Sequence, residues 1–388
     1  MSKTKLFDMI HKTYNANFVG DDFVENDQLP QHAIPMSSIL LGKINMPKSQ
    51  EFEGLQNIEI SGGETTIHGR KQKGKRNTSN NKILPYDSNR IILRNKVDKS
   101  DYVNASWISR RVQEGSYDLL RPFQYTPFEE ISFIISQAPS PLTLRAYFEM
   151  INQEGVDIVV CFNKEMNKVR ETVGTAYRIR GNIVKKIICD DKINNNLYKR
   201  KVGVLIPSSS SRRIHRYTEF QCIAPSNLQS EGSIKSFLMT FSIIRDETKK
   251  KQEFMKILTH DKQSGNCLAA VFILLYEILE EIDKALLLIE EKKFDRKDNE
   301  KLVNIHLLVS EMRKKRMNSI KDFDHYTFIF KCINYYVSHK SEFDKIEAMP
   351  KKSSKHVDTN DLVERDDDVT YYLPGNNPID TIEEEYVI

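Results

Sequence analysis

The chain has 388 residues, enough for one large domain or two small ones with a buried core. Its charge is uneven: 57 basic and 44 acidic residues lie in 1–355, whereas ten acidic residues and one basic residue lie in 356–388. No uninterrupted apolar window reaches the ~18 residues of a membrane span, and the first 20 residues hold no long apolar stretch, which argues against a secretory signal.

The five cysteines are scattered, odd in number and without metal-ligand spacing. Such usage is typical of a reducing compartment. We therefore expect a cytoplasmic protein, a nuclear protein, or one found in both places.

Residues 1–74 predict a partly helical N-terminal extension that ends in a basic loop. Helical patterns occur at 3–14 and 37–41, and Gly, Ser, Thr, Asn and Lys concentrate in 61–81, which predicts a loop. The basic run 68–76 inside it could bind nucleic acid or direct nuclear import. Because no aromatic residues interleave with the charges to stack on bases, a solvated loop is favoured.

From 75 to 338, strand and helix patterns follow each other as in an α/β domain. Residues 156–162 are nearly all apolar, as a central strand buried on both faces requires. The β-branched or alternating segments 183–189, 202–206 and 214–222 predict an antiparallel meander. Helical periods are predicted at 143–153, 233–245, 265–282 and 325–337. The acidic segment 339–388 shows no periodicity and predicts a disordered tail.

Five segments, in the right order, resemble the signatures of protein-tyrosine phosphatases. They are 83–93 with 101–108, then 133–143, 147–150, 156–162, and 312–316 with 325–328. The resemblance covers roughly 75–338 and implies the fold of that family, an α/β fold with a highly twisted mixed central sheet flanked by helices.

The segment 259–270 resembles the phosphate-binding loop of this family, which reads His-Cys, five residues, then Arg, and opens into a helix. His260 matches the family's His, which usually holds the loop by hydrogen bonds. Asp261 stands at the nucleophile position and Cys267 at the position of the phosphate-binding Arg. A carboxylate at the floor of the pocket would repel a phosphate dianion, and the bidentate Arg is missing.

The general acid of the family lies in a Trp-Pro-Asp loop. The matching positions here are Ile223, Ala224 and Pro225, which offer no acid. Glu219 and Glu231 are nearby carboxylates, but neither matches the position.

Two further functional positions differ. The two Gln residues that position water in the family are replaced by Lys321 and His325, and the aromatic of the substrate-recognition loop is replaced by Asn80. With all functional loops changed and the scaffold segments retained, catalysis through a cysteinyl phosphate is not expected.

Three sharper interpretations of the former pocket are weaker than their structural alternatives. Cys267 could be a displaced nucleophile, but a buried small residue is favoured. Phosphotyrosine binding lacks the Arg and the aromatic, although Lys262 and Lys321 could restore some positive charge. A metal ion bound by His260, Asp261, Asp324 and His325 is conceivable from the residue types.

The sequence therefore predicts a catalytically inactive tyrosine-phosphatase-like protein, a pseudophosphatase, without cofactor or metal. We expect it to act as a scaffold or regulatory subunit that binds a protein partner. The alternative is an active phosphatase with rearranged pocket chemistry on phosphotyrosine or acidic lipids, which would require Arg212, Arg213 or Arg316 in the pocket. Nucleic-acid or membrane-surface binding through 68–76 is a third, weaker hypothesis.

Overall fold

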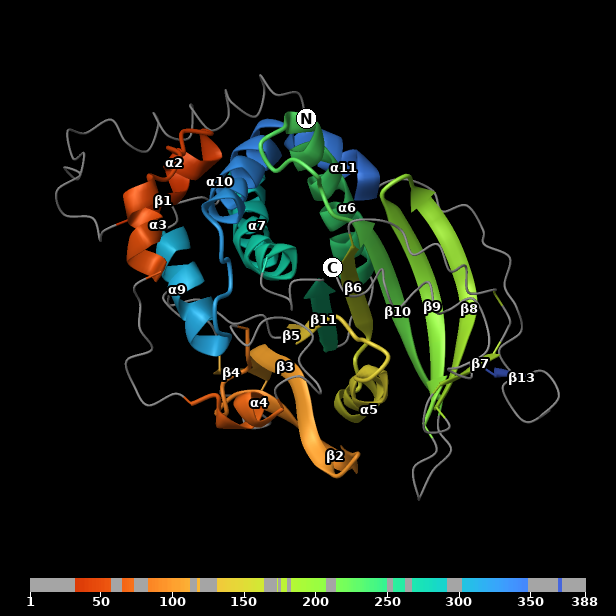
Figure 1. Cartoon of the computed structure of the whole chain (residues 1–388). Coiled ribbons are helices and arrows are strands. Elements are labelled where there is room, and N and C mark those ends of the chain that lie inside the picture. Colours follow the sequence, from red (N-terminus) through yellow and green to blue (C-terminus); the bar gives the residue numbers. More distant parts are fainter. Residues whose placement is uncertain are drawn as a thin grey trace, which may run out of the picture.

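A computed structural model describes residues 32–56, 65–72, 83–111, 117–118, 131–163, 173, 176–179, 183–206, 214–249, 254–261, 267–291, 302–347 and 369–371. Its centre is a mixed, 11-stranded sheet in the order β13-β7-β8-β9-β10-β6-β11-β5-β3-β2, with β4 paired to β3 (Figure 1). Its strands are β2 (Arg90–Val97), β3 (Ser100–Arg111), β4 (Tyr117–Asp118), β5 (Ile131–Gln137), β6 (Ile158–Asn163), β7 (Ala176–Ile179), β8 (Ile183–Asn194), β9 (Leu197–Leu205), β10 (Ile214–Ile223), β11 (Met255–Asp261) and β13 (Val369–Tyr371). A separate pair joins β1 (Ile34–Pro35) to β12 (Leu302–Val303).

The four central strands β5, β11, β6 and β10 run parallel to one another, and antiparallel pairs extend the sheet on both sides. β11 lies between β5 and β6, so its last residue pairs with Gln137 on one side and Phe162 on the other. The carboxyl ends of parallel strands meet at the same edge of a sheet, where α/β folds place their ligand sites. The segment 259–270 leaves the sheet at this edge.

Helices cover both faces of the sheet (Figure 1). They are α2 (Met36–Leu40), α3 (Ser49–Gln56), α4 (Ile67–Lys71), α5 (Leu144–Glu154), α6 (Glu231–Lys249), α7 (Leu268–Glu290), α9 (Ile305–Lys315), α10 (Phe323–Ser338) and α11 (Lys340–Glu347). The larger apolar core joins one face of the sheet to α6, α7 and α10, and the smaller one joins the other face to α5. This arrangement confirms the predicted fold class. Among the described helices, none is long and apolar enough to span a membrane.

The predicted buried strand and buried helix occur at the centre of this core. β6 holds the apolar run, and Ile158, Val159 and Val160 are all buried. α7 buries nearly every residue of its first three turns, as its all-round apolar sequence requires. It begins at Leu268, three residues after the predicted start.

Two parts of the predicted organisation need correction. Inside the predicted loop 61–81, α4 forms because the Asp87 carboxylate accepts hydrogen bonds from the backbone N–H groups of Ile67 (2.7 Å) and His68 (3.1 Å). Beyond Ser338, the predicted disordered tail contains α11, whose Phe343 is buried and stacks on Tyr336 at 5.2 Å between ring centroids.

The tail also provides β13, which pairs in parallel with β7. Within the basic run 68–76, the described residues 68–72 belong to α4 and its end, and residues 73–76 lie outside the described part of the chain. The helix predicted over 3–14 also lies outside it. The helix predicted at 37–41 corresponds to α2, which packs with α3 against the larger core through Met36, Ile39 and Phe52.

Candidate functional site

The site is built around the connection from β11 to α7. His260 is buried at the end of β11, where its ring meets Tyr147 edge-on with centroids 5.7 Å apart. Burial lowers the pKa of His260 to about 4, so the imidazole is neutral at physiological pH. Its surroundings are those of a packed core residue at the base of the loop.

Asp261 ends β11 and caps the helix that follows. Its Oδ2 accepts hydrogen bonds from the backbone N–H of Cys267 (3.2 Å) and of Ala269 (3.3 Å). The first N–H groups of a helix have no partner within the helix, and the helix dipole favours a negative charge at this end. The Asp261 carboxylate thus takes two of the donors that a bound anion would use. Residues 262–266, including Lys262, lie outside the described part of the chain.

Cys267 is the N-cap residue of α7 and is only 3% exposed. Burial raises the pKa of its thiol, and the negative charges of Asp261 and Asp322 raise it further. A nucleophilic cysteine needs the opposite environment, one that lowers the thiol pKa. The surroundings of Cys267 therefore favour a neutral thiol.

Arg316 is one of the three arginines whose presence in the pocket the active-phosphatase hypothesis requires. It is fully buried, and its guanidinium donates to Ser106 Oγ (3.1 Å) and to Asn104 Oδ1 (2.8 Å). Burial lowers the pKa of Arg316 to about 10, which leaves it charged at physiological pH, and the charge of Asp261 opposes the shift. Arg316 thus ties its segment to β3 and offsets the Asp261 charge. Arg212 and Arg213 lie outside the described residues.

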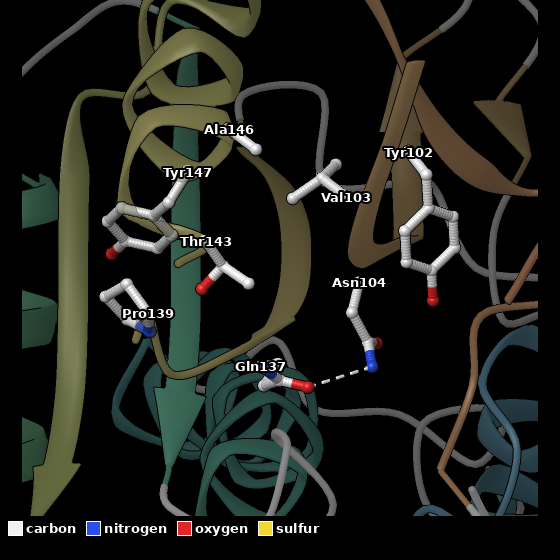
Figure 2. Close-up of a pocket in the computed structure, with 8 residues that line it drawn as sticks. All are labelled: Tyr102, Val103, Asn104, Gln137, Pro139, Thr143, Ala146 and Tyr147. Carbon is white, nitrogen blue, oxygen red and sulfur yellow. Dashed lines mark hydrogen bonds between the residues drawn. The ribbon is translucent and has the colours of Figure 1, made fainter. Parts of the chain in front are cut away.

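A small cavity lies beside this network, between β3, the end of β5 and α5 (Figure 2). Its volume is about 10 Å³, room for about one water molecule. The side chain of Asn104 donates a hydrogen bond to Gln137 Oε1 (3.2 Å) across its floor, as Figure 2 shows. This cavity is too small for an aryl phosphate.

The sequence match puts the family's acid loop in the connection from β10 to α6. Ile223 is the last residue of β10, Ala224 packs against the larger core, and Pro225 follows. Further along, Gln229 donates to Asp324 Oδ1 (3.0 Å) and accepts from Lys331, so the segment 224–230 is tied to α10.

Glu219 and Glu231, the two carboxylates near the matched acid positions, belong to β10 and α6. Glu219 lies within β10 and accepts from Gln221 Nε2 (2.6 Å), and Glu231 is the first residue of α6. Asn80 lies outside the described part of the chain.

The start of α10 meets the start of α7. Asp322 is the N-cap residue of α10, and the Nδ1 atom of His325 lies 3.6 Å from Asp322 Oδ2. Within the described residues, potential ligand atoms of Cys267, Asp322 and His325 all lie within 4.8 Å of one another. The metal set conceived from sequence is not the one brought together, since His260 packs on Tyr147 and Asp324 binds Gln229. Sequence reasoning missed Asp322 because the family resemblance gives it no role.

Comparisons with known proteins agree with this architecture. The family model "Protein-tyrosine phosphatase" matches residues 74–335. A protein-tyrosine-phosphatase PTP1 of Arabidopsis thaliana is 29% identical over 154 residues, 38% of this chain and 41% of the relative. A tyrosine-protein phosphatase 3 of Dictyostelium discoideum is 22% identical over 264 residues, 65% of this chain and 24% of the relative. The chain thus matches less than half the length of each of these curated relatives.

A comparison with solved structures supports the same fold. A solved structure from work on PTPN18 and distinct HER2 tyrosine phosphorylation sites has a TM-score of 0.54 to this chain at 17% identity, covering 74% of this chain and 94% of that one. The family match over residues 74–335, which is more than half of the chain, shows that this chain belongs to the protein-tyrosine phosphatase family.

Proposed function

We propose that this chain is a catalytically inactive member of its family and acts as a scaffold or regulatory subunit that binds a protein partner. The observation that carries the proposal is the position of Asp261. A carboxylate stands where the mechanism needs a thiolate, and it accepts two N–H groups at the start of α7. Inorganic phosphate or a phosphoester would have to displace this carboxylate and then tolerate its charge.

The other catalytic parts support the same conclusion. Cys267 offers a buried neutral thiol in place of the arginine clamp, and Arg316 is engaged with Asn104 and Ser106. No acid stands at the three matched positions from Ile223 to Pro225. Covalent phosphoryl transfer needs a nucleophile, an anion clamp and a proton donor together, and each has a replacement of the wrong chemistry.

A scaffold role fits what the chain retains. The core on both faces of the sheet is complete over the described residues, so the fold can present surfaces although its pocket has lost its chemistry. The basic character of 1–355 and the acidic character of 356–388 offer charged surfaces for a partner. We expect the partner to be a protein of the cytoplasm or the nucleus.

The second candidate is an active phosphatase with rearranged chemistry. The names of the relatives from Arabidopsis and Dictyostelium favour it, since both are called phosphatases. It would require Cys267 to ionise despite its buried setting, or Asp261 to leave its two backbone donors and attack phosphorus.

The deciding experiment combines affinity purification of the full chain with a phosphatase assay on the same eluate, using an aryl phosphate. We expect a stoichiometric protein partner and no turnover above that of Asp261→Ala. Turnover that persists through purification to homogeneity and disappears in Asp261→Ala or Cys267→Ser would overturn the proposal. An active phosphatase assayed in parallel controls for the conditions.

A further inference from the structure

Three metal-ligating side chains converge where α7 and α10 begin. Cys267 caps α7, Asp322 caps α10, and His325 lies in the first turn of α10. Their donor atoms lie within 4.8 Å of one another. The Nδ1 atom of His325 is buried and has no hydrogen-bond partner among the described residues. A buried ring nitrogen without such a partner is available to a ligand.

The charges around this cluster favour a cation. Burial lowers the pKa of His325, and the negative charges of Asp322, Asp261 and Asp324 oppose this shift, which places three carboxylates near the ring. Lys321 opposes Asp261 and Asp322 in the environment of Cys267. The start of α7, which would otherwise favour an anion, already has the Asp261 carboxylate on its N–H groups. Arg316 offsets the charge of Asp261, so Asp322 and Asp324 at the start of α10 supply the negative charge next to His325.

We propose that Cys267, Asp322 and His325 form a binding site for a divalent transition metal ion, with zinc as the best match. One sulfur, one imidazole nitrogen and one carboxylate oxygen are ligands that zinc accepts in proteins. Three protein ligands leave the fourth tetrahedral position open to water or to a group from a partner.

The geometry needs only a small adjustment. Zinc bonds of about 2.0–2.3 Å in a tetrahedron place donor atoms roughly 3.5 Å apart. The pair of His325 Nδ1 and Asp322 Oδ2 is already 3.6 Å apart. The Asp322 side chain is 48% exposed, so it can rotate toward Cys267 without disturbing the core.

The proton balance of metal binding follows from the three ligands. Burial favours the neutral form of His325, whose ring nitrogen can bind metal without losing a proton. The Cys267 thiol gives up its proton to solvent when its sulfur binds the metal, so one proton leaves for each ion bound. Asp322 binds as the carboxylate.

The test uses the full chain, stripped with a chelator and titrated with Zn²⁺ against a chromophoric chelator. We expect one ion per chain, and Co²⁺ in its place should give a thiolate charge-transfer band in the near ultraviolet. Cys267→Ser, Asp322→Asn and His325→Ala should each weaken binding at least about tenfold. The matched controls Cys189→Ser and His339→Ala, which lie away from the cluster, should bind as the wild type does.

Absence of competition with the chelator would overturn the proposal, as would a stoichiometric site that survives Cys267→Ser or a cobalt complex without the thiolate band. Circular dichroism checks the fold of every variant. If Cys267→Ser does not fold, Asp322→Asn decides the question, because its half-exposed side chain can be changed without loss of core packing. The readout is independent of phosphatase turnover, so this proposal and the proposed function can fail separately.

Discussion

The Oδ2 atom of Asp261 lies 3.2 Å from the backbone nitrogen of Cys267, and this one hydrogen bond joins the last residue of β11 to the cap of α7. In a family whose loop binds an external phosphate, the chain here supplies its own anion at the helix start. The carboxylate accepts two N–H groups at the helix start, and we expect its charge to repel other anions. Its removal should therefore affect both stability and anion binding.

Replacing Asp261 by Ala should destabilise the protein by ~1 kcal/mol, because two N–H groups of α7 lose their acceptor. Asp261→Asn keeps an acceptor oxygen and should cost less. Urea unfolding followed by circular dichroism measures both variants. If Asp261→Ala is as stable as the wild type, the carboxylate does not act as a cap. Asp344→Ala, at an exposed residue of α11, is the control.

The double variant Asp261→Cys with Cys267→Arg should bind orthovanadate or phosphate, whereas the wild type and both single variants should not. The double change removes the repelling carboxylate and adds a bidentate donor at the matched position. Thermal unfolding with and without the oxyanion measures this, since ligand at 100 times its Kd stabilises by about 2.7 kcal/mol. Stabilisation of the wild type by phosphate would contradict the proposed function.

Long apolar patterns predicted the centre of the fold well. The run in β6 and the all-round apolar α7 leave few alternatives, because only buried elements tolerate such sequences. Short elements were missed for physical reasons. α4 depends on capping by Asp87, some twenty residues along the chain, and α11 is mostly polar with Phe343 as its buried anchor.

For the candidate site too, local features could be predicted from the sequence and long-range contacts could not. Local sequence patterns predicted a strand before Asp261 and a helix after Cys267, and the structure has Asp261 at the end of β11 and Cys267 at the cap of α7. That these residues stand at the nucleophile and arginine positions of the family stays a prediction. Side-chain partners across the fold could not be predicted. The binding of Arg316 to Asn104 and the approach of Asp322 to Cys267 join residues far apart in sequence, and only the packing of α7, α9 and α10 on the sheet brings them together.

Gln229→Ala should loosen the segment 224–230, because it removes the hydrogen bonds to Asp324 and from Lys331. Both bonds join the neutral amide to a charged group at an exposed position, where solvent screening leaves a net contribution of ~1 kcal/mol, so amide exchange in this segment should accelerate about fivefold. Hydrogen exchange read by mass spectrometry tests this. Exchange in β11 should stay the same, and unchanged exchange in 224–230 would show that the segment is held by other contacts.

Asp283→Ala should destabilise the protein by about 3 kcal/mol, because it leaves a buried charge without its partner. Arg245 is fully buried, lies 2.7 Å from the Asp283 carboxylate and donates to Tyr336 Oη (2.6 Å). The midpoint of urea unfolding measures the loss. Glu342→Ala, which breaks the exposed pair with Lys235, should leave the midpoint nearly unchanged and serves as the control. A loss below 1 kcal/mol for Asp283→Ala would mean that Arg245 finds another partner.

Glu277 should make the protein less stable as pH rises. Burial raises the pKa of its carboxyl group to about 8, and its Oε1 has no hydrogen-bond partner among the described residues. Between about pH 4.5 and 8 the folded chain holds this proton and the unfolded chain does not, so the unfolding free energy falls with increasing pH over this window.

Glu277→Gln removes the ionisable group. The variant should therefore gain stability relative to the wild type as pH rises toward 8, by at least tenfold in the unfolding equilibrium, equivalent to about 1.4 kcal/mol. Urea unfolding at pH 5, 6.5 and 8 measures the difference, and Glu290→Gln, at an exposed position of the same helix, should show no such trend. A constant difference between Glu277→Gln and the wild type across these pH values would mean that Glu277 ionises normally in the folded state.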